Sequence, residues 1–369
     1  MRVLSITRIV MINIIVTVCL FELGLRAQQK IGPLIDLDLR AENIMIGLSD
    51  ELNHIPVPGE YWDSDGFRTM EEPISARCTR RLLFMGDSFM QAAQKIPGGA
   101  VVASLPSDTI PVHVRQFFRD ALGKEVCVFN AGYASYSPSI FVPQAKKLIP
   151  LVKPDIVVID VDETDLWDDY YRYRELVARD ANGSIVAVRP TPINVQFLQG
   201  LVASTSKTLY VHRLLAKLYF TAVEFPAMAA RYNQRRPADN LMLAKLTAAE
   251  ANEMHRAEIE YFTRTLQDLT QTVVALMGTP NSLIYVHHPH LQHLGSPGVV
   301  FNNIVSETVQ DVARRNNVKY YDATDDLKVE FGEKPQRYYI PDDVHFNADG
   351  TRAYGIAVAK YLAESLRCD

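Results

Sequence analysis

The chain has 369 residues, 48% of them hydrophobic, and a formal net charge of −5 at pH 7. This apolar share is enough for a large buried core, so the composition is that of a globular protein. The small negative charge, with no block of Lys and Arg interleaved with aromatic residues, argues against nucleic acid as a partner.

The first apolar run predicts a membrane segment. Hydrophobic residues extend from Ile9 to Phe21, and polar residues return with Glu22. This run is short for a full span, as in a secretory signal peptide, but no pair of small residues suited to cleavage follows it. Counted from Val3 to Leu25, with Arg8 reaching the interface, the segment can cross a bilayer. We therefore expect an uncleaved signal anchor over residues 1–30, and the basic residues on both flanks leave its orientation open.

The four cysteines have neither a metal-binding spacing nor the pattern of a disulfide framework. Cys19 lies in the apolar run, while Cys78, Cys127 and Cys368 are far apart. Cys78 and Cys127 could form one bridge in an oxidising compartment. Because Cys127 falls in an apolar strand pattern, we interpret it instead as a small buried thiol.

Strand and helix patterns alternate along most of the remaining chain. Residues 31–80 have no regular pattern and are expected to form an irregular lead-in to a domain over 81–369. Five short apolar runs then predict strands at Leu82–Met85, Val126–Phe129, Ile156–Val161, Leu283–Val286 and Val318–Tyr321. The clearest helical patterns cover Val112–Leu122, Leu246–Leu276, Ile304–Arg314 and Thr351–Leu366. This alternation predicts a three-layer α/β/α fold around a five-stranded parallel, flavodoxin-like sheet.

The longest gap between expected strands reads as an insertion into this domain. Over residues 166–245 it contains a hairpin signal at Asp180–Gly183 and helical patterns around Thr208–Val223. We expect a helical and hairpin cap on the same sheet, and no separate domain.

Polar residues follow every expected strand. In open α/β sheets functional groups gather at the carboxyl ends of the strands, so we expect these residues at one edge. They are Asp87 and Ser88, then Asn130 to Gly132, Asp162 to Asp165, His287 with His288, and the loop from Asp342 to His345.

Three of these residues have the chemistry of a serine hydrolase. A serine hydroxyl needs an imidazole to take its proton, and that imidazole needs a carboxylate to fix its tautomer. We predict Ser88 as the nucleophile, His345 as the base and Asp342 as the orienting acid, with Asp343 as the rival to Asp342. We expect Asp87 to brace the turn through backbone hydrogen bonds.

These motifs resemble the sequence blocks of the SGNH/GDSL hydrolase family. Gly86-Asp87-Ser88 resembles the nucleophile block, Asn130-Ala131-Gly132 the glycine block, Glu163-Thr164-Asp165 the usual Gly-x-Asn-Asp block, and Asp342-Asp343-Val344-His345 the final Asp-x-x-His block. The likeness extends from about Trp62 to Leu366, and the Asp-x-x-His spacing favours Asp342. The apolar N-terminus and the turn from Asp63 to Arg68 also resemble the membrane-anchored bacterial branch. That branch implies a single-pass anchor with an extracytoplasmic, periplasmic catalytic domain.

The resemblance also implies an oxyanion hole. It would consist of the backbone N–H groups of Ser88 and Gly132 and the side chain at position 164. The family has Asn there, whereas this chain has Thr164, whose hydroxyl reaches less far. Losing one such donor costs about 10²–10³ in turnover. The substitution therefore predicts an activity that is low, shifted to another substrate, or lost.

Other residues near this edge are candidate substrate contacts: Asn130, Asp165, Trp167, His287 and His288. Trp167 begins an aromatic and acidic stretch that suits sugar binding, although packing of the insertion against the sheet explains the stretch as well. The histidines from His287 to His293 suggest a metal site. Strand alternation separates His287 from His288, Pro289 breaks helical spacing, and no carboxylate lies within the segment. We therefore expect no metal and no cofactor.

Together these features predict a serine esterase that removes acyl groups from a carbohydrate or other cell-envelope ester through an acyl-enzyme. Acetyl is the acyl group we expect. One alternative is an O-acyltransferase that uses the same triad. Another is a catalytically silent envelope or polysaccharide-binding protein, which Thr164 favours. The expected partners are a small-molecule or glycan ester and the membrane.

Overall fold

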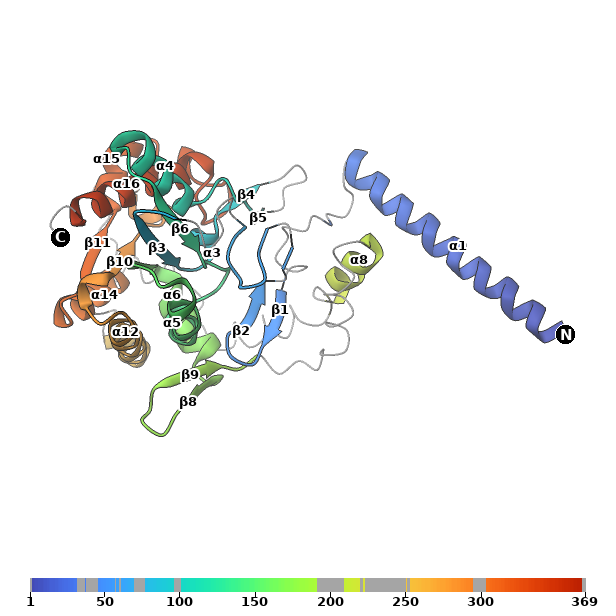
Figure 1. Cartoon of the computed structure of the whole chain (residues 1–369), viewed down its shortest axis with the longest axis horizontal. Helices are drawn as coiled ribbons and strands as arrows, with labels where there is room; N and C mark the ends of the chain where they lie inside the picture. Colours follow the sequence, from blue (N-terminus) through green and yellow to red (C-terminus); the bar gives the residue numbers. More distant parts are fainter. Residues whose placement is uncertain are drawn as a thin grey trace.

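The computed structural model describes residues 2–31, 37, 46–56, 58–59, 61–69, 77–95, 101–190, 209–219, 222, 250, 253–294 and 303–366. A five-stranded parallel sheet lies at the centre of the folded body (Figure 1). Its strands are β3 (Arg80–Met85), β6 (Val126–Asn130), β7 (Ile156–Asp160), β10 (Leu283–His287) and β11 (Lys319–Asp322). Their order is β11-β10-β7-β3-β6, and every neighbouring pair is parallel. The predicted sheet is therefore confirmed, with strand ends within two residues of those expected.

Helices cover both faces of this sheet. Because successive strand residues point to opposite faces, they enter two separate hydrophobic cores. Leu83 and Phe129 belong to the core with helices α5 (Pro138–Val152), α12 (Arg256–Met277) and α14 (Ile304–Arg315). Phe84 and Val128 belong to the core with α4 (Ile110–Leu122), α15 (Thr324–Phe331) and α16 (Ala348–Ser365). The three-layer α/β/α architecture is confirmed.

Shorter elements connect these layers and carry much of the polar edge. The helical ones are α3 (Ser88–Gln91), α6 (Glu163–Trp167), the π-helix η1 (Asp168–Tyr173), α13 (Leu291–Leu294), and the 3₁₀ turns η3 (Pro280–Ser282) and η4 (Pro335–Tyr338). The described residues also contain three antiparallel strand pairs. They are β1 (Ile46–Ser49) with β2 (Asn53–Pro56), β4 (Ala93–Lys95) with β5 (Val101–Ala103), and β8 (Val177–Arg179) with β9 (Ile185–Val188). The last lies where the Asp180–Gly183 signal predicted a hairpin. The first gives part of the expected irregular lead-in a regular structure.

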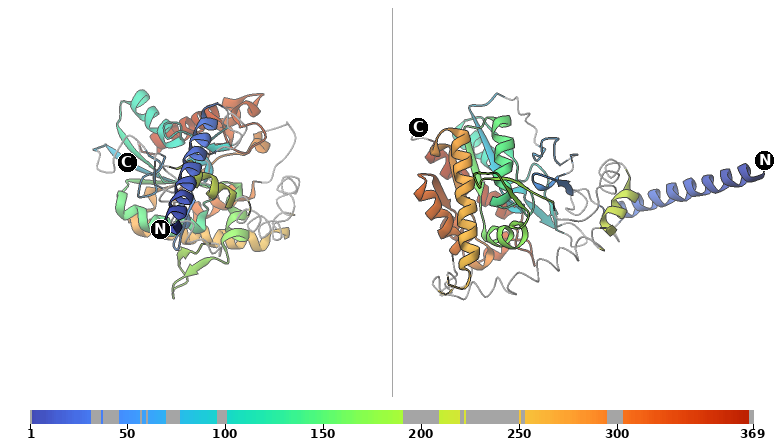
Figure 2. Two further views of the ribbon diagram at one scale, coloured as in Figure 1. Left: turned by 90° about the vertical axis from the view of Figure 1, so that its right-hand side faces the viewer. Right: turned by 90° about the horizontal axis from the view of Figure 1, so that it is seen from below.

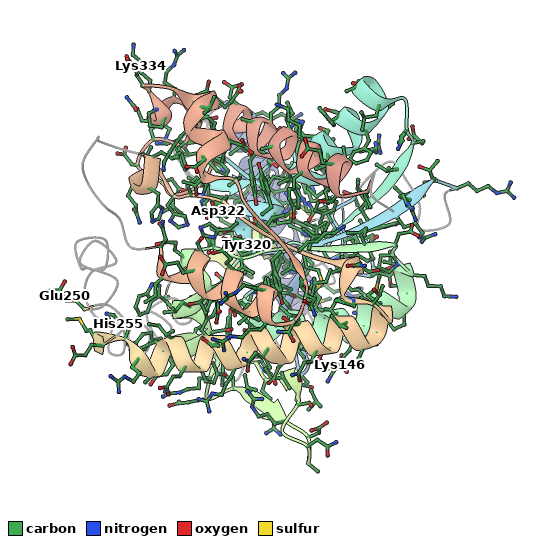
Figure 3. The ribbon with its side chains drawn as sticks, turned by 90° about the vertical axis from the view of Figure 1, so that its left-hand side faces the viewer. Lys146, Glu250, His255, Tyr320, Asp322 and Lys334 are labelled. Atoms are coloured by element: carbon green, nitrogen blue, oxygen red, sulfur yellow. A yellow bond between two sulfur atoms is a disulfide. The ribbon has the colours of Figure 1, made fainter. Side chains whose placement is uncertain are left out.

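The edge strand β11 has a polar connection to helix α14. Figure 3 shows Tyr320 and Asp322 on this strand, and the Ser306 hydroxyl donates to Asp322 Oδ2 at 2.6 Å. Ser306 Oγ also lies 2.7 Å from Tyr320 Oη. These contacts fix the outer strand against the helix that covers it.

Only part of the predicted insertion lies within the described residues. Helix α8 (Tyr210–Tyr219) coincides with the helical pattern around Thr208–Val223. Residues 191–208 and 223–249 lie outside the described part, as does the start of the helix predicted from Leu246. Within the described residues, the long helix α12 begins at Arg256.

A single long helix, α1 (Arg2–Ile31), projects from the folded body (Figures 1 and 2). Its segment Thr7–Gln28 is long and apolar enough to cross a membrane, and almost none of it is buried against the protein. At its inner end, the Glu22 carboxylate accepts hydrogen bonds from the backbone N–H groups of Tyr210 and Val211 in α8. The helix therefore has the properties of a membrane anchor or a signal sequence.

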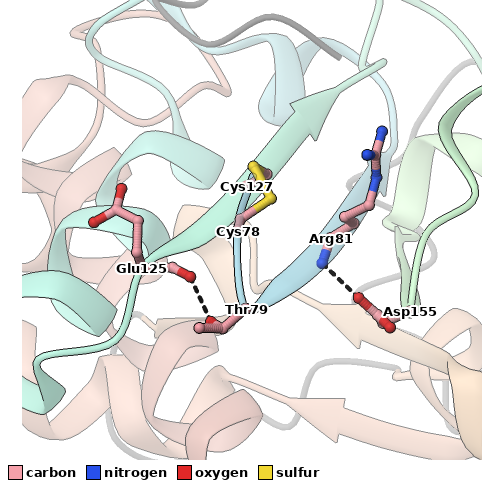
Figure 4. Close-up of a disulfide and its surroundings, with 6 residues drawn as sticks. All are labelled: Cys78, Thr79, Arg81, Glu125, Cys127 and Asp155. Carbon is pink, nitrogen blue, oxygen red and sulfur yellow. Dashed lines mark hydrogen bonds between the residues drawn. A yellow bond between two sulfur atoms is a disulfide. The ribbon is translucent and has the colours of Figure 1, made fainter. Parts of the chain in front are cut away.

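A disulfide corrects the interpretation of Cys127 as a free buried thiol. Cys78 and Cys127 are bonded, with Cα atoms 5.6 Å apart (Figure 4). Cys127 lies in β6 beside Arg81 of β3, so Cys78, just before β3, comes within bonding reach. In the same region the backbone N–H of Arg81 donates to Asp155 at 2.7 Å. Proximity between neighbouring strands, which sequence spacing does not reveal, makes the bond possible.

Candidate active site

Ser88 lies on a tight turn between β3 and α3. Asp87 caps the short helix, because its Oδ1 accepts a hydrogen bond from the Phe89 N–H at 2.8 Å. Gly86 has no room for a side chain, since a Cβ there would lie 2.8 Å from Met90 Cβ. The turn thus holds Ser88 half-buried at the carboxyl edge of the sheet, and the predicted bracing role of Asp87 is confirmed.

The hydroxyl of Ser88 meets the imidazole of His345 across 257 residues of sequence. Ser88 Oγ lies 2.7 Å from His345 Nε2. On the other side of the ring, His345 Nδ1 lies 2.5 Å from Asp343 Oδ1. With its proton on Nδ1, the ring donates to the carboxylate and leaves Nε2 free to accept the serine proton. The geometry is that of a nucleophile, a base and an orienting acid.

The carboxylate on His345 belongs to Asp343, which corrects the assignment to Asp342. Asp342 has a positive φ of 63°, and its side chain is exposed. Asp343 Oδ1 also accepts from the backbone N–H of His345 at 3.0 Å. The turn is closed by the Ile340 N–H, which donates to the His345 carbonyl at 2.9 Å. This backbone path turns Asp342 outward and Asp343 inward, which residue spacing alone does not predict.

Asp343 stays ionised in this environment. Partial burial favours its protonated form, but hydrogen bonds from the His345 side chain and backbone outweigh that effect and lower the pKa of Asp343. A carboxylate with a depressed pKa can stabilise an imidazolium over a wide pH range.

Two of the three expected oxyanion-hole donors have acceptors within the protein. The Gly132 N–H donates to Asn130 Oδ1 at 2.9 Å. The Thr164 hydroxyl donates to Asp162 Oδ1 at 2.7 Å, and the Thr164 N–H donates to the same oxygen at 2.8 Å. Gly132 has no room for a side chain, because a Cβ would lie 2.6 Å from Met90 Cβ. The third expected donor is the backbone N–H of Ser88 itself, the first residue of α3.

The five residues expected to contact substrate are buried and bonded within the protein. Each is at most 5% exposed: Asn130, Asp165, Trp167, His287 and His288. Asn130 Nδ2 donates to the Met90 carbonyl, and Asp165 accepts from the Asp162 N–H. The Trp167 ring stacks on Tyr171 at 5.9 Å. In this structure these side chains support the edge of the sheet, and their role as substrate contacts stays a prediction.

A buried group of carboxylates and imidazoles lies beside the Ser88 turn, and the sequence analysis missed it as a unit. His288 Nδ1 lies 3.1 Å from Asp160 Oδ1, and His290 Nε2 lies 2.8 Å from Asp162 Oδ2. Tyr354 donates its hydroxyl to Asp160 at 2.9 Å. Asp160 ends β7 and pairs in register with Val286 of β10, so residues two positions further along both strands also meet. That register was the missing information.

The charges in this group shift several pKa values. Burial lowers the affinity of His288 for a proton, but Asp160 and Asp162 outweigh it and raise the pKa of His288 to about 10. Burial favours protonation of Asp162, but His288 and His290 hold its pKa well below the usual value. Burial and the negative charge of Asp162 together raise the pKa of Asp87 to about 8. At this edge the surroundings therefore favour the protonated form of Asp87 and the ionised form of Asp162.

The ring of Phe89 lies between this group and His345. Its ring centroid lies 3.9 Å from that of His288 and 5.0 Å from that of His345. One aromatic side chain is therefore in contact with both a buried imidazole and the His345 ring.

No protein-family model and no curated protein sequence matches this chain. Solved structures that resemble it include a two-domain esterase (CEX) active on acetylated mannans, co-crystallised with mannopentaose, at 14% identity and a TM-score of 0.42. That match covers 78% of this chain and 49% of the esterase, so the chain spans about half of its length. A lipase/acylhydrolase from Enterococcus faecalis has 14% identity and a TM-score of 0.41, with 78% and 96% covered. A catalytic mutant of Axe2, an acetylxylan esterase from Geobacillus stearothermophilus, has 13% identity and a TM-score of 0.42, with 78% and 94% covered. None of these similarities bears on which residues act in this chain.

Proposed function

We propose that this protein is a serine esterase of the SGNH/GDSL type that hydrolyses acyl esters through an acyl-enzyme. The observation that carries the proposal is the aligned set of Ser88, His345 and Asp343, with contacts of 2.7 Å and 2.5 Å. The resemblance of four sequence blocks to those of that family, with Thr164 in place of the usual Asn, supports the same assignment. Together they supply the three groups that acyl transfer from an ester requires.

The chemistry follows from the positions of the three side chains. His345 Nε2 takes the proton of Ser88 as Oγ attacks the ester carbonyl, and the resulting imidazolium is stabilised by Asp343. The same nitrogen then protonates the leaving alkoxide. In the second half, His345 activates a water that hydrolyses the acyl-serine and releases the acid. The Ser88 N–H is the oxyanion donor that this mechanism uses in the present conformation.

The proposed substrate is an acetyl or other short acyl ester of a carbohydrate or another cell-envelope component, and the proposed location is the membrane. Two features support a membrane-anchored, extracytoplasmic domain. Helix α1 is apolar enough to span a bilayer. The Cys78–Cys127 disulfide is typical of oxidising compartments. An acyltransferase that uses the same triad differs only in whether a sugar hydroxyl replaces water.

A fluorophosphonate probe tests the activated serine without knowledge of the substrate. The full-length protein in detergent should be labelled, and Ser88→Ala should abolish labelling and the hydrolysis of a short-chain aryl ester. His345→Ala should do the same, whereas Ser137→Ala, which changes a buried serine outside the triad, should leave labelling intact. Equal labelling of the parent and Ser88→Ala would reject the proposal.

One observation favours the alternative of a catalytically silent binding protein. The Thr164 hydroxyl is committed to Asp162, so the position where the family has an oxyanion-hole Asn offers no free donor here. Analysis of the reaction products distinguishes the three candidate functions. Release of acetate identifies the hydrolase, transfer to an added glycan identifies the transferase, and a parent protein without labelling or turnover identifies the silent protein.

A further inference from the structure

The buried histidines at the end of β10 share one side of the chain with a carboxylate from β7. His288 and His290 are two residues apart, and in extended backbone residues at this spacing point the same way. The argument from strand alternation separated His287 from His288, but the two histidines that lie on the same side are His288 and His290. Asp162 lies two residues beyond β7, opposite His288, because Asp160 and Val286 are paired in register.

We propose that Asp162, His288 and His290 form a binding site for one Zn²⁺ ion. One ligand atom from each residue lies within 4.8 Å of the others. His290 Nε2 is 2.8 Å and His288 Nε2 is 3.6 Å from Asp162 Oδ2. Ligands of a tetrahedral zinc with bonds of about 2.0–2.1 Å lie about 3.3 Å apart, so small side-chain shifts suffice. Two imidazoles and a carboxylate are ligands that Zn²⁺ favours, and a water would complete the tetrahedron.

A buried ring nitrogen without a hydrogen bond points independently to a ligand at this place. His288 is fully buried, and its Nε2 has no hydrogen-bond partner among the described residues. A buried polar atom without a partner costs about 1–3 kcal/mol. Its other ring nitrogen lies against Asp160, as in the carboxylate–histidine pairs that orient metal-binding imidazoles. Its Nε2 lies 3.6 Å from Asp162 Oδ2, which is within ion-pair range but too far for a hydrogen bond.

The carboxylate is oriented in the same way. Asp162 Oδ1 accepts two hydrogen bonds from Thr164, so Oδ2 faces the two imidazoles. The side chains of Asp162 and His288 are at most 1% exposed and that of His290 is 6% exposed, so the ion would be enclosed by protein. In this position the metal would tie the end of β7 to the end of β10. It would act as a structural support of the edge, not as a reactant, because Ser88 and His345 have their own partners.

Metal titration of the full-length protein in detergent tests this site. After bound metal is removed with a chelator, the protein should bind about one added Zn²⁺ per chain. Its unfolding temperature should be higher with zinc than without it. Co²⁺ in its place should give the intense visible absorption of a tetrahedral site. His290→Gln and His288→Gln should each weaken binding by about 100-fold or more, and Asp160→Asn by about 10–100-fold.

Two matched variants separate this site from others. His113→Gln alters a histidine of helix α4 that is paired with Asp108 at 3.1 Å, and it should leave binding unchanged. His345→Gln should also keep it. Absence of the Co²⁺ spectrum and of zinc in the parent would overturn the proposal, as would binding that survives His288→Gln together with His290→Gln. Loss of binding in His345→Gln would place the ion at the triad and refute the site. The titration of the parent protein can refute the proposal by itself, so the test does not depend on whether every variant folds.

Discussion

The imidazole of His345 lies against Asp343, two residues before it in the chain, and not against Asp342. Adjacent carboxylates thus have different environments. One is held inward by two hydrogen bonds with the same histidine, and the other is exposed on a left-handed turn residue.

This difference predicts unequal effects of two neighbouring substitutions. Asp343→Asn should lower kcat for a short-chain aryl ester by about 10³–10⁴, because the amide favours the wrong imidazole tautomer. Asp342→Asn should leave kcat within about 2-fold. Steady-state kinetics of both variants check this, and a larger loss from Asp342→Asn would restore the assignment made from sequence spacing.

Thr164 sets a second expectation. Thr164→Asn places a carboxamide, with a longer reach, where the SGNH/GDSL family has its oxyanion donor. It should raise kcat, by up to about 10²-fold if the hole gains a full donor. Thr164→Val removes the hydroxyl that donates a hydrogen bond to Asp162. Turnover should therefore change by less than about 3-fold in this variant, and a loss as large as 10²-fold would show that the hydroxyl already acts on the oxyanion.

The disulfide should contribute substantially to stability. The bond spans 49 residues of sequence, for which chain entropy predicts about 4 kcal/mol. Removing it with Cys78→Ala and Cys127→Ala together should lower the free energy of unfolding by an amount of this order. Chemical unfolding of parent and variant measures the difference. A reductant should destabilise the parent and leave the double variant unaffected.

Asp169 predicts a pH dependence of stability. Burial raises the pKa of Asp169 to about 7, against hydrogen bonds from Ser137 and Ser139 that favour the ionised form. The folded state then binds this proton more tightly than the unfolded state, whose pKa is near 3.8. Its contribution is therefore present below pH 4 and is lost as the pH rises to 7.

Asp169→Asn isolates this effect, because the amide oxygen can still accept both hydrogen bonds. The variant should gain stability relative to the parent as the pH rises from 4 to 8, by an amount on the order of 4 kcal/mol. Unfolding curves at both pH values provide the comparison. A constant difference between the two proteins would contradict the raised pKa.

Strand positions could be predicted well because the five buried strands are short apolar runs, and their alternation with helices admits few topologies. Helix α5 could not be predicted, because Pro143 and Pro150 lie inside it and proline ordinarily disfavours a helix interior. Eleven of its fifteen residues are buried, so tertiary packing outweighs local propensity.

By itself the sequence determined the class of fold, the serine on its turn and the distant histidine, because apolar periodicity and residue chemistry are local properties. Only the tertiary structure decided that Asp343 is the carboxylate on His345, that Cys78 bonds to Cys127, and that Asp162 meets His288 and His290. Each of these depends on a backbone turn or on the register between neighbouring strands. Those relationships arise when the chain packs, and residue spacing does not contain them.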